Sequence, residues 1–499
     1  MSLEEKAAQL IFPAFRFSSP NFDEITNLIK CGVGGICVFG GSIFDVPSAI
    51  NSFQRLAKYP LIICSDLEDG AGQQVKGIST LPSNMAVGAS RSSELAYLKG
   101  SITASEAKSL GINMVLAPVV DVNTNPLNPI INIRSYGEDE ELVIEMGSEF
   151  IRGCAEAGIL TCLKHFPGHG DTAIDSHILL PATEKSTLKP YASIGNTADA
   201  VMVGHILAKD IDDKYPSSIS KKAVTDTLRK AIGFNGIIIT DALIMGGITS
   251  KYTEEEATVS AINAGIDVIL FPKEPMQAID TISKGMKNGS IKEATINNTV
   301  ERILSSKEKV GLFRGKILDV ANIEKLSQVG KDNPSAQRIA DASITLLKDD
   351  KHLLPLKARN ICHKTFGDGC EHFLNELEHN GLIVKTLSDR PVPDLCIITV
   401  TSKPTAFSGK IGLDETSEKE ITSIVNSAKD TIIISFGDPY IFSQLITLNS
   451  RLSTLICAYS NCEYSQRATA KALLGSIKFN GKLPITIPGA FSFGSGINP

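Results

Sequence analysis

The chain has 499 residues, of which 42% are apolar and 21% are charged, and its formal net charge is −6. This composition is typical of a globular protein with large apolar cores, and the length suggests two or three domains. Lysine and arginine form no dense run, which makes nucleic acid a poor candidate partner. No stretch approaches about 20 uninterrupted apolar residues, so we expect no membrane-spanning helix.

The first residues and the cysteines favour a cytoplasmic location. Residues 1–6 lack the cationic start and apolar core of a signal peptide. The ten cysteines include no Cys-x-x-Cys pair, which indicates reduced thiols rather than a disulfide framework. Cys362, His363, Cys370 and His372 form one loose cluster, but their spacing does not fit a usual zinc site. We therefore expect no metal and no organic cofactor, and the sequence does not fix the oligomeric state.

Short, nearly continuous apolar runs recur along the first 315 residues or so, as in strands that are buried on both faces. The predicted strands are Leu10–Phe15, Gly35–Phe39, Leu61–Ser65, Met114–Val120, Leu160–Lys164, Ala200–Gly204, Gly236–Thr240 and Asp267–Phe271. The segments between them have helical periodicity, and Gly111, Gly158 and Gly265 stand where helix ends favour a left-handed residue. Eight repeats of strand and helix predict a closed (β/α)8 barrel, with an open doubly wound sheet as the alternative.

The strand–helix rhythm restarts after a long predicted helix, Lys292–Val310, and a polar connection. The second set of predicted strands is Ile344–Leu347, Ile361–Lys364, Ile383–Lys385, Leu395–Val400, Thr431–Ser435 and Leu455–Tyr459. We therefore expect an α/β protein with a catalytic barrel over residues 1–320, a linker over 321–334, and a smaller αβα sandwich over 335–499.

Polar side chains gather just after the predicted barrel strands, where active sites of such barrels lie. They include Asp66, with Glu68 and Asp69 close behind; Asp121, followed by a long loop with Arg134; the run from Lys164 and His165 to His177; His205; and Asp241. Four of the chain's eight histidines fall after strands five and six. This concentration favours a catalytic site over scattered structural histidines.

Asp175, His177 and Asp241 have the residue types that acid–base and nucleophilic catalysis need. A carboxylate at position 175 can reach the imidazole two residues later, fixing its tautomer and stabilising the imidazolium. Such a histidine can donate a proton and then take one back. Asp241 follows an apolar strand and can attack an anomeric carbon, although it could instead cap the next helix.

At these residues the chain resembles glycoside hydrolase family 3, and most closely its β-N-acetylglucosaminidase branch with the signature K-H-F-P-G-H-G-x4-D-x-H. Residues 164–177 match every fixed position of that signature. The segments 117–123, 134–139, 240–241 and 481–488 also match the family, so the similarity runs through nearly the whole chain.

The resemblance implies a role for each matching residue. Asp241 falls on the nucleophile, His177 on the acid/base and Asp175 on its partner. Five further positions are predicted to bind the non-reducing N-acetylglucosamine (GlcNAc) or to line the site, with the role of the last less defined: Asp66, Arg134, Lys164, His165 and His205. The implied reaction is the removal of terminal β-linked GlcNAc by double displacement, from muropeptides of peptidoglycan recycling or from chitooligosaccharides.

One departure from the family pattern affects the predicted substrate. The family often shows D-Q-E-G-G-R-V after strand three, whereas residues 66–72 read D-L-E-D-G-A-G and lack the arginine. Contacts beyond the first sugar are therefore less well predicted than the reaction.

Other functions remain open on the sequence. A β-glucosidase could use the same fold. A phosphorylase could use it as well, since a neutral histidine base does not repel phosphate. Lys164 could instead form a Schiff base, as in aldolase-like barrels, or the chain could be a sugar-binding protein that has lost catalysis. In the second domain, Asp414, Glu415 and Glu418 read as a solvated start of a helix.

Overall fold

A computed structural model describes residues 1–318, 333–358, 360–387, 395–448 and 451–498. By their contacts the residues form two compact units. The first comprises Met1–Ser79, Tyr97–Asp121 and Gly147–Asp332, and the second comprises Thr80–Ala96, Val122–Met146 and Asn333–Pro499. The predicted boundaries at residues 320 and 335 stay a prediction, and 321–332 of the predicted linker lie outside the described residues.

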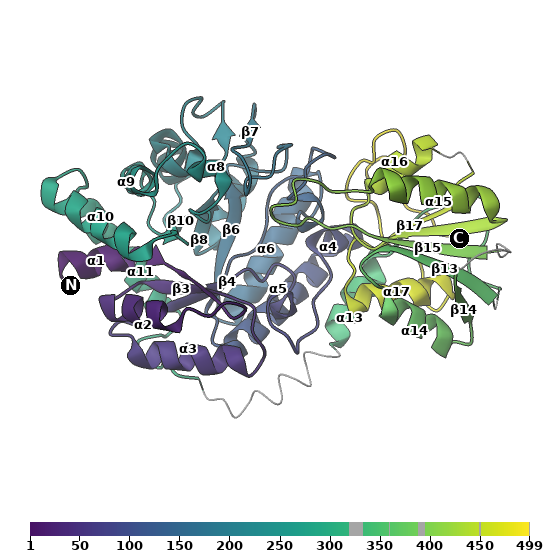
Figure 1. Ribbon diagram of the computed structural model, residues 1–499, viewed down its shortest axis with the longest axis horizontal. Helices are drawn as coiled ribbons and strands as arrows, with labels where there is room; N and C mark the ends of the chain where they lie inside the picture. Colours follow the sequence, from purple (N-terminus) through teal and green to yellow (C-terminus); the bar gives the residue numbers. More distant parts are fainter. Residues whose placement is uncertain (319–332, 359, 388–394, 449–450, 499) are drawn as a thin grey trace. The chain divides into compact units, whose positions relative to one another are not determined.

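The first unit is built on parallel strands, several of which are labelled in Figure 1, and their pairings close them into a ring, as the sequence predicted. In ring order the strands are β1 (Ile11–Phe12) with β2 (Ala14–Arg16), β3 (Gly35–Phe39), β4 (Ile62–Ser65), β5 (Met114–Val115), β6 (Leu160–Phe166), β8 (Ala200–Val203), β10 (Ile237–Thr240) and β11 (Ile269–Leu270). A parallel bridge between Ile239 and Val268 and the pairing of β11 with β1 close the ring. The prediction of a closed (β/α)8 barrel is thus confirmed, and the alternative prediction of an open doubly wound sheet is wrong.

Proline explains where two predicted strands are shorter than expected. The predicted strand Leu10–Phe15 is divided at Pro13, and Met114–Val120 keeps regular pairing only at its first two residues before Pro118. A proline lacks the N–H that a ladder requires, so regular pairing stops there. The chain beyond Pro118 rejoins β6 through a single bridge between Val119 and Lys164.

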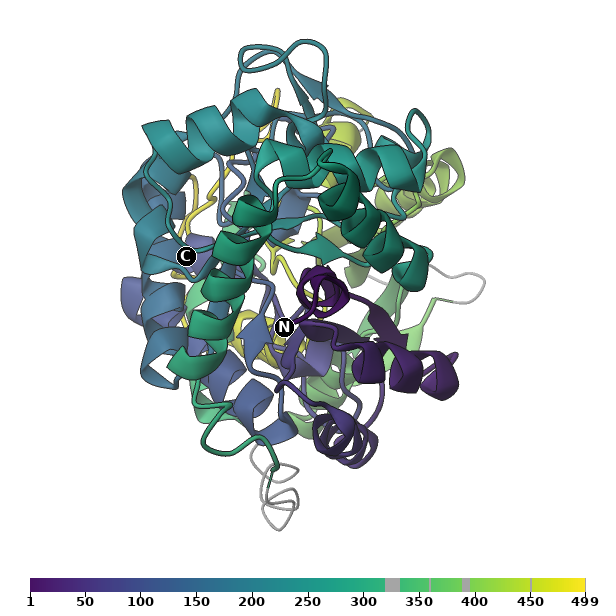
Figure 2. The same cartoon turned by 90° about the vertical axis from the view of Figure 1, so that its left-hand side faces the viewer.

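Helices surround the strands of the first unit (Figure 2). They are α1 (Leu3–Gln9), α2 (Phe22–Cys31), α3 (Asp45–Leu56), α5 (Ser93–Leu110), α6 (Glu140–Glu156), α7 (Lys189–Ile194), a π-type helix (Lys222–Ala231), α8 (Gly246–Thr249), α9 (Glu254–Ala264), α10 (Pro275–Asn288) and α11 (Glu293–Lys309). Gly111, Gly158 and Gly265 all have positive φ at helix ends, which confirms that prediction. Helices α5 and α6 each continue from one unit into the other.

The second unit is a three-layer sandwich around a six-stranded sheet (Figure 1). The sheet order is β12 (Thr345–Asp349), β17 (Thr454–Cys457), β16 (Asp430–Ser435), β15 (Leu395–Thr401), β13 (Asn360–Gly367) and β14 (Ile383–Thr386), and the β12 pairing alone is antiparallel among them. One layer holds α13 (Pro334–Ser343), α14 (Glu371–His379) and α17 (Glu463–Leu473), and the other α15 (Glu415–Ser427) and α16 (Ile441–Leu448). Asp414 caps α15 by accepting a hydrogen bond from the Ser417 amide, which confirms the predicted helix start.

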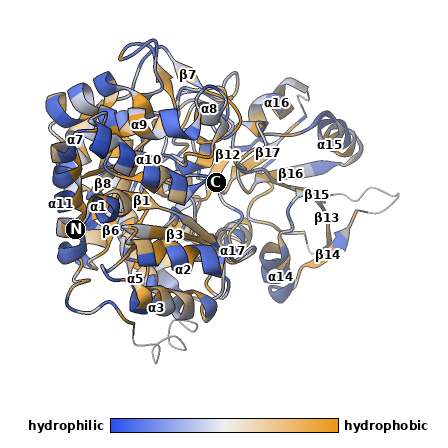
Figure 3. Ribbon diagram, turned by 60° about the vertical axis from the view of Figure 1, so that its left-hand side comes forward, coloured by the Kyte–Doolittle hydropathy of each residue, from blue (hydrophilic) through white to orange (hydrophobic). Residues whose placement is uncertain are grey.

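Apolar side chains fill the interior of each unit. Hydrophilic residues lie on outward turns of the helices (Figure 3). The core of the second unit includes Met85, Ala86 and Ala89 of helix α4 (Asn84–Ser90) and Ile133, although these residues precede the C-terminal sheet by more than 200 positions. In the described part of the chain, no helix combines the length and apolar character needed to cross a bilayer. All ten cysteines are free thiols.

Lys307 is a charged residue fully buried between helices of the first unit. Its Nζ atom donates a hydrogen bond to Oε1 of Gln9 at 2.7 Å. Burial lowers the pKa of this ammonium to about 7 from its ordinary value of 10.5. Between these values the unfolded chain binds more protons than the folded protein, so this residue makes the free energy of unfolding rise with pH.

We therefore expect Lys307→Met to flatten the pH dependence of stability between pH 7 and 9.5. Relative to the variant, the wild type should gain up to about 1.4 kcal/mol per pH unit across this window. Denaturant unfolding of both proteins at several pH values measures the difference. Parallel curves for the two proteins would show that Lys307 does not titrate in this range.

Candidate active site

Five of the predicted site residues stand at the carboxyl ends of barrel strands in the first unit. Asp66 directly follows β4, Lys164 and His165 lie near the end of β6, His205 comes just after β8, and Asp241 directly follows β10. Because all these strands are parallel, their carboxyl ends form one rim of the barrel. The structure therefore brings these five residues to the same rim, as the sequence predicted.

Asp241 has the electrostatic surroundings of an ionised carboxylate. Burial raises its pKa, but the charges of His165, His205 and His177 and a hydrogen bond from the Ala242 amide outweigh burial and hold the pKa below its usual value. The Ala242 amide donates to Asp241 Oδ1 at 2.8 Å. An ionised carboxylate can serve as a nucleophile.

Asp175 and His177 form the predicted pair in the loop that follows β6. Oδ1 of Asp175 accepts the backbone N–H of His177 at 2.9 Å and lies 2.8 Å from Nδ1 of its ring. The Asp175 side chain is buried, whereas 23% of the His177 side chain is exposed. With Nδ1 facing the carboxylate, Nε2 is the nitrogen that can exchange a proton with a bound substrate.

Two glycines soon after Asp241 hold the loop that carries His177. The amide of Gly246 donates to the His177 carbonyl, and that of Gly247 donates to the Ser176 carbonyl, both at 2.9 Å. A Cβ atom at position 246 would lie 2.0 Å from the carbonyl oxygen of Ile178 and 3.0 Å from that of His177. This close approach requires glycine, so the segment after Asp241 directly fixes the loop that carries His177.

Lys164 is a buried cation between two carboxylates. Its Nζ atom lies 2.7 Å from Asp66 Oδ1 and 2.6 Å from Glu68 Oε1, and 2% of the side chain is exposed. The two carboxylates stabilise the positive charge, whereas a Schiff base forms only from an uncharged amine. The arrangement therefore favours a charged hydrogen-bond donor over the aldolase-like alternative.

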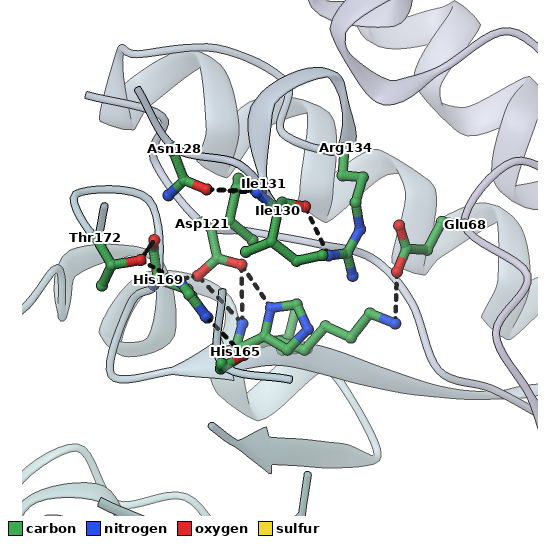
Figure 4. Close-up of polar contacts among 12 residues, drawn as sticks. Glu68, Asp121, Asn128, Ile130, Ile131, Arg134, His165, His169 and Thr172 are labelled. Atoms are coloured by element: carbon green, nitrogen blue, oxygen red, sulfur yellow. Dashed lines mark hydrogen bonds and ion pairs between the residues drawn. The ribbon is translucent and has the colours of Figure 1, made fainter. Parts of the chain in front are cut away.

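Asp121 organises the turn that follows Lys164 (Figure 4). Its fully buried carboxylate accepts the backbone N–H of His165 at 3.2 Å and that of His169 at 2.6 Å. It also lies 2.7 Å from Nδ1 of the His165 ring. Burial raises the pKa of Asp121, but His165 and the contacts with His169 outweigh it and lower the pKa below its usual value. The carboxylate thus sets both the path of the turn and the orientation of the His165 ring.

His169 and His205 are buried histidines whose hydrogen bonds brace the site. Burial lowers the pKa of His169 to about 4, and its ring nitrogens contact Thr172 Oγ1 and Ser176 Oγ within the same loop. Burial also lowers the pKa of His205, against the opposing charge of Asp241. The Ala242 carbonyl accepts from His205 Nε2 at 3.1 Å, and Nδ1 of the ring lies 2.7 Å from Ser218 Oγ. Its contacts are those of a residue that holds the Asp241 turn, and its predicted contact with substrate stays a prediction.

Arg134 belongs to the second unit, in the segment Val122–Met146. Its guanidinium donates to the Ile130 carbonyl at 2.9 Å, and its own carbonyl accepts from the Asn84 side chain at 2.8 Å. The side chain is partly exposed. Its predicted role in sugar binding stays a prediction.

Sequence reasoning assigned no role to Asp121, Glu68 or the glycine pair at 246–247. Asp121 and Glu68 both stand just beyond a strand, and this position was a usable signal for a site residue. Adjacent glycines soon after Asp241 were a weaker signal of close backbone approach. Which backbone they approach follows only from the folded structure.

Among the residues that the structure describes, His, Cys, Asp and Glu side chains nowhere gather in a group of three or more that could hold a metal ion. In the loose cluster noted in the sequence, His363 Nε2 contacts Thr399 Oγ1 at 3.0 Å and Cys370 Sγ at 3.6 Å. The ring of His372 instead lies 3.8 Å from Glu463.

Comparisons with known proteins agree with the fold. The sequence is 27% identical to the β-N-acetylglucosaminidase/β-glucosidase of Cellulomonas fimi, over 97% of this chain and 94% of that protein. The solved structure of a glycoside hydrolase family 3 β-N-acetylglucosaminidase from Paenibacillus sp. str. FPU-7 superposes with a TM-score of 0.83 at 28% identity, covering 98% of this chain and 99% of that one. The β-glucoside phosphorylase BglX bound to 2FGlc superposes with a TM-score of 0.89 at 27% identity, covering 98% and 95%.

Residues 2–306 match the sequence pattern of the glycosyl hydrolase family 3 N terminal domain. This match covers more than half of the chain and includes every predicted site residue. The resemblance found in the sequence is therefore confirmed: the chain belongs to glycosyl hydrolase family 3.

Proposed function

We propose that the chain is a retaining β-N-acetylglucosaminidase that removes β-linked GlcNAc from non-reducing ends. The observation that carries the proposal is the Asp175–His177 pair, which the segment directly after Asp241 holds in place. An ionised carboxylate and an imidazole that keeps one nitrogen for proton exchange are the two groups that double displacement needs. The names of the relatives in Cellulomonas fimi and Paenibacillus support GlcNAc as the sugar.

In the first step a carboxylate oxygen of Asp241 forms a bond to the anomeric carbon as the glycosidic C–O bond breaks. His177 gives the proton on Nε2 to the leaving oxygen, and Asp175 stabilises the imidazolium before that transfer. In the second step His177 takes a proton from water, the water oxygen bonds to the anomeric carbon, and the bond to Asp241 breaks. Two inversions at one carbon restore the β-configuration.

Sugar binding is assigned to Asp66, Arg134, Lys164 and His165. In the Lys164 group two carboxylates surround one ammonium, so the group can both accept hydrogen bonds from sugar hydroxyls and donate to them. We propose GlcNAc-containing muropeptides, as in peptidoglycan recycling, or chitooligosaccharides as natural substrates.

The second candidate is a phosphorylase on the same fold. The structural similarity to a β-glucoside phosphorylase favours it, because that chain superposes over nearly its whole length. A histidine that has lost its proton is neutral, so it does not repel phosphate as a second carboxylate would. Phosphate could then replace water in the second step.

The leaving group separates the roles of Asp241 and His177. Asp241→Ala should abolish turnover of every aryl-GlcNAc substrate. His177→Ala should lower kcat/KM by about 10³-fold for a GlcNAc disaccharide but less than about tenfold for dinitrophenyl-GlcNAc, whose leaving group needs no proton. His379→Ala, which alters an exposed histidine of α14, is the matched control. Equal losses on both substrates in the His177 variant would contradict its role as acid.

Gly246→Ala tests whether the glycine pair positions the acid. The new methyl group meets the Ile178 carbonyl, so the loop must move and His177 must shift with it. We expect a loss of about 10- to 100-fold in kcat/KM for the disaccharide and a much smaller loss for dinitrophenyl-GlcNAc. Gly315→Ala serves as control, because a Cβ atom there meets nothing within 4 Å. A similar loss on both substrates would mean that Gly246 does not act through His177.

Sugar and acceptor are tested together with p-nitrophenyl glycosides of GlcNAc, glucose and xylose, each with and without phosphate. We expect the GlcNAc substrate to be turned over fastest and free GlcNAc to form at the same rate in both conditions. Formation of GlcNAc-1-phosphate together with phosphate-dependent turnover would instead identify a phosphorylase. Faster turnover of the glucoside would identify a β-glucosidase.

A further inference from the structure

The segment that carries Arg134 is tied to the C-terminal residues of the second unit. Val122–Met146 belongs to the same compact unit as Asn333–Pro499, although more than 180 residues separate the two in sequence. Arg134 lies in a single 3-10 turn, Asn132–Arg134, whose first residue is completely buried. The conformation of this turn determines where the Arg134 side chain starts.

Asp438 holds the turn at Asn132. The side-chain amide of Asn132 donates to Asp438 Oδ1 at 3.0 Å, and the backbone N–H of Tyr440 donates to the same oxygen at 2.9 Å. Asp438 is itself fixed through its backbone, because its N–H donates to the Ser402 carbonyl and its carbonyl accepts from Ser435 Oγ. Asp438 is therefore a buried, preorganised acceptor for the Asn132 amide.

The backbone at Asn132 is in a conformation that needs such support. Its φ of +40° lies in the left-handed region, which asparagine tolerates better than most residues but which still has an energetic cost. The hydrogen bond to Asp438 offsets this cost. Two residues later, the Arg134 amide donates to the Ile131 carbonyl at 2.8 Å, so the constraint at Asn132 is passed along the turn.

Two further ties keep the ends of the segment in place. The side chain of Asn123 donates to the hydroxyl of Tyr440 at 2.9 Å. The carboxylate of Glu138 accepts from the backbone amide and the hydroxyl of Thr486 at 2.6 and 2.7 Å. The C-terminal residues thus hold the segment before, at and after the turn that contains Arg134.

We propose that Asp438 is a positioning residue for substrate binding, acting through Asn132 on Arg134. The proposal rests on the sugar-binding role assigned to Arg134 under the proposed function. It gives the C-terminal residues of the second unit a defined part in the reaction, because Asp438 fixes the turn from which the Arg134 side chain starts. The ligand class is the non-reducing sugar, whose hydroxyls a guanidinium binds through charge-assisted hydrogen bonds.

A double-mutant cycle on p-nitrophenyl-GlcNAc hydrolysis tests the coupling. Asp438→Ala should raise KM about tenfold with kcat changed by less than about threefold, and should weaken inhibition by free GlcNAc to the same degree. Asp438→Asn keeps an oxygen for the Asn132 and Tyr440 donors, so it should retain wild-type KM. In an Arg134→Ala background, Asp438→Ala should cause no further rise in KM. Asp368→Ala, at an exposed carboxylate of the same unit, is the control.

Asn132→Gly provides the same test where Asp438→Ala does not fold. This substitution removes the side-chain amide that donates to Asp438, but glycine still adopts the positive φ without strain. It should therefore raise KM as Asp438→Ala does. Multiplicative effects of the Asp438 and Arg134 substitutions, or equal losses in kcat and KM with no rescue by asparagine, would overturn the proposal. An unchanged KM in Arg134→Ala alone would instead refute the sugar-binding role of Arg134, which is a failure of the proposed function and is seen separately.

Discussion

The buried carboxylate of Asp121 is the constraint on which the candidate site depends most. An ionised group removed from water is costly unless hydrogen bonds and opposite charges surround it. Asp121 meets this condition with two backbone N–H groups and the ring of His165, all from one turn of the chain. These contacts restrict the backbone conformation of the turn. The turn starts directly after Lys164 and continues into the loop that contains Asp175 and His177.

The two proposed catalytic groups are held by different means, and each suits its chemistry. Asp241 lies on the end of a barrel strand among histidines, where its charged form is favoured. His177 lies on a loop, where a carboxylate orients its ring and two glycines fix its backbone. A nucleophile requires a fixed position relative to the anomeric carbon, which a strand end provides. A proton donor has to contact leaving groups of different shapes, so a loop held by hydrogen bonds is a suitable position for the donor.

Much of this arrangement could be predicted from local sequence. Buried strands show as apolar runs, and glycines after helical segments mark left-handed helix ends, as at Gly111 and Gly265. The Asp175–His177 contact spans only two residues, so spacing alone suggested it. The family pattern then assigned roles that spacing could not assign.

The remaining features depend on contacts between residues far apart in the chain. Asp121 reaches the turn 44 and 48 residues later, and Asp438 reaches Asn132 across 306 residues. A sequence pattern can indicate that a carboxylate follows a strand. The hydrogen-bond partner of that carboxylate depends on which strands are neighbours in the folded protein. For the same reason, the grouping of residues 122–146 with the C-terminal sandwich could not be inferred from strand and helix signals.

The division of the chain into its two units also bears on how the protein can be dissected. The chain enters the second unit three times, and the first two entries lie between segments of the barrel. A cut near residue 320 would leave Met85, Ala86, Ala89 and Ile133 without the C-terminal part of the core that covers them. The truncated protein would thus expose an apolar surface to water. A stable truncation at this point would require polar substitutions on that surface.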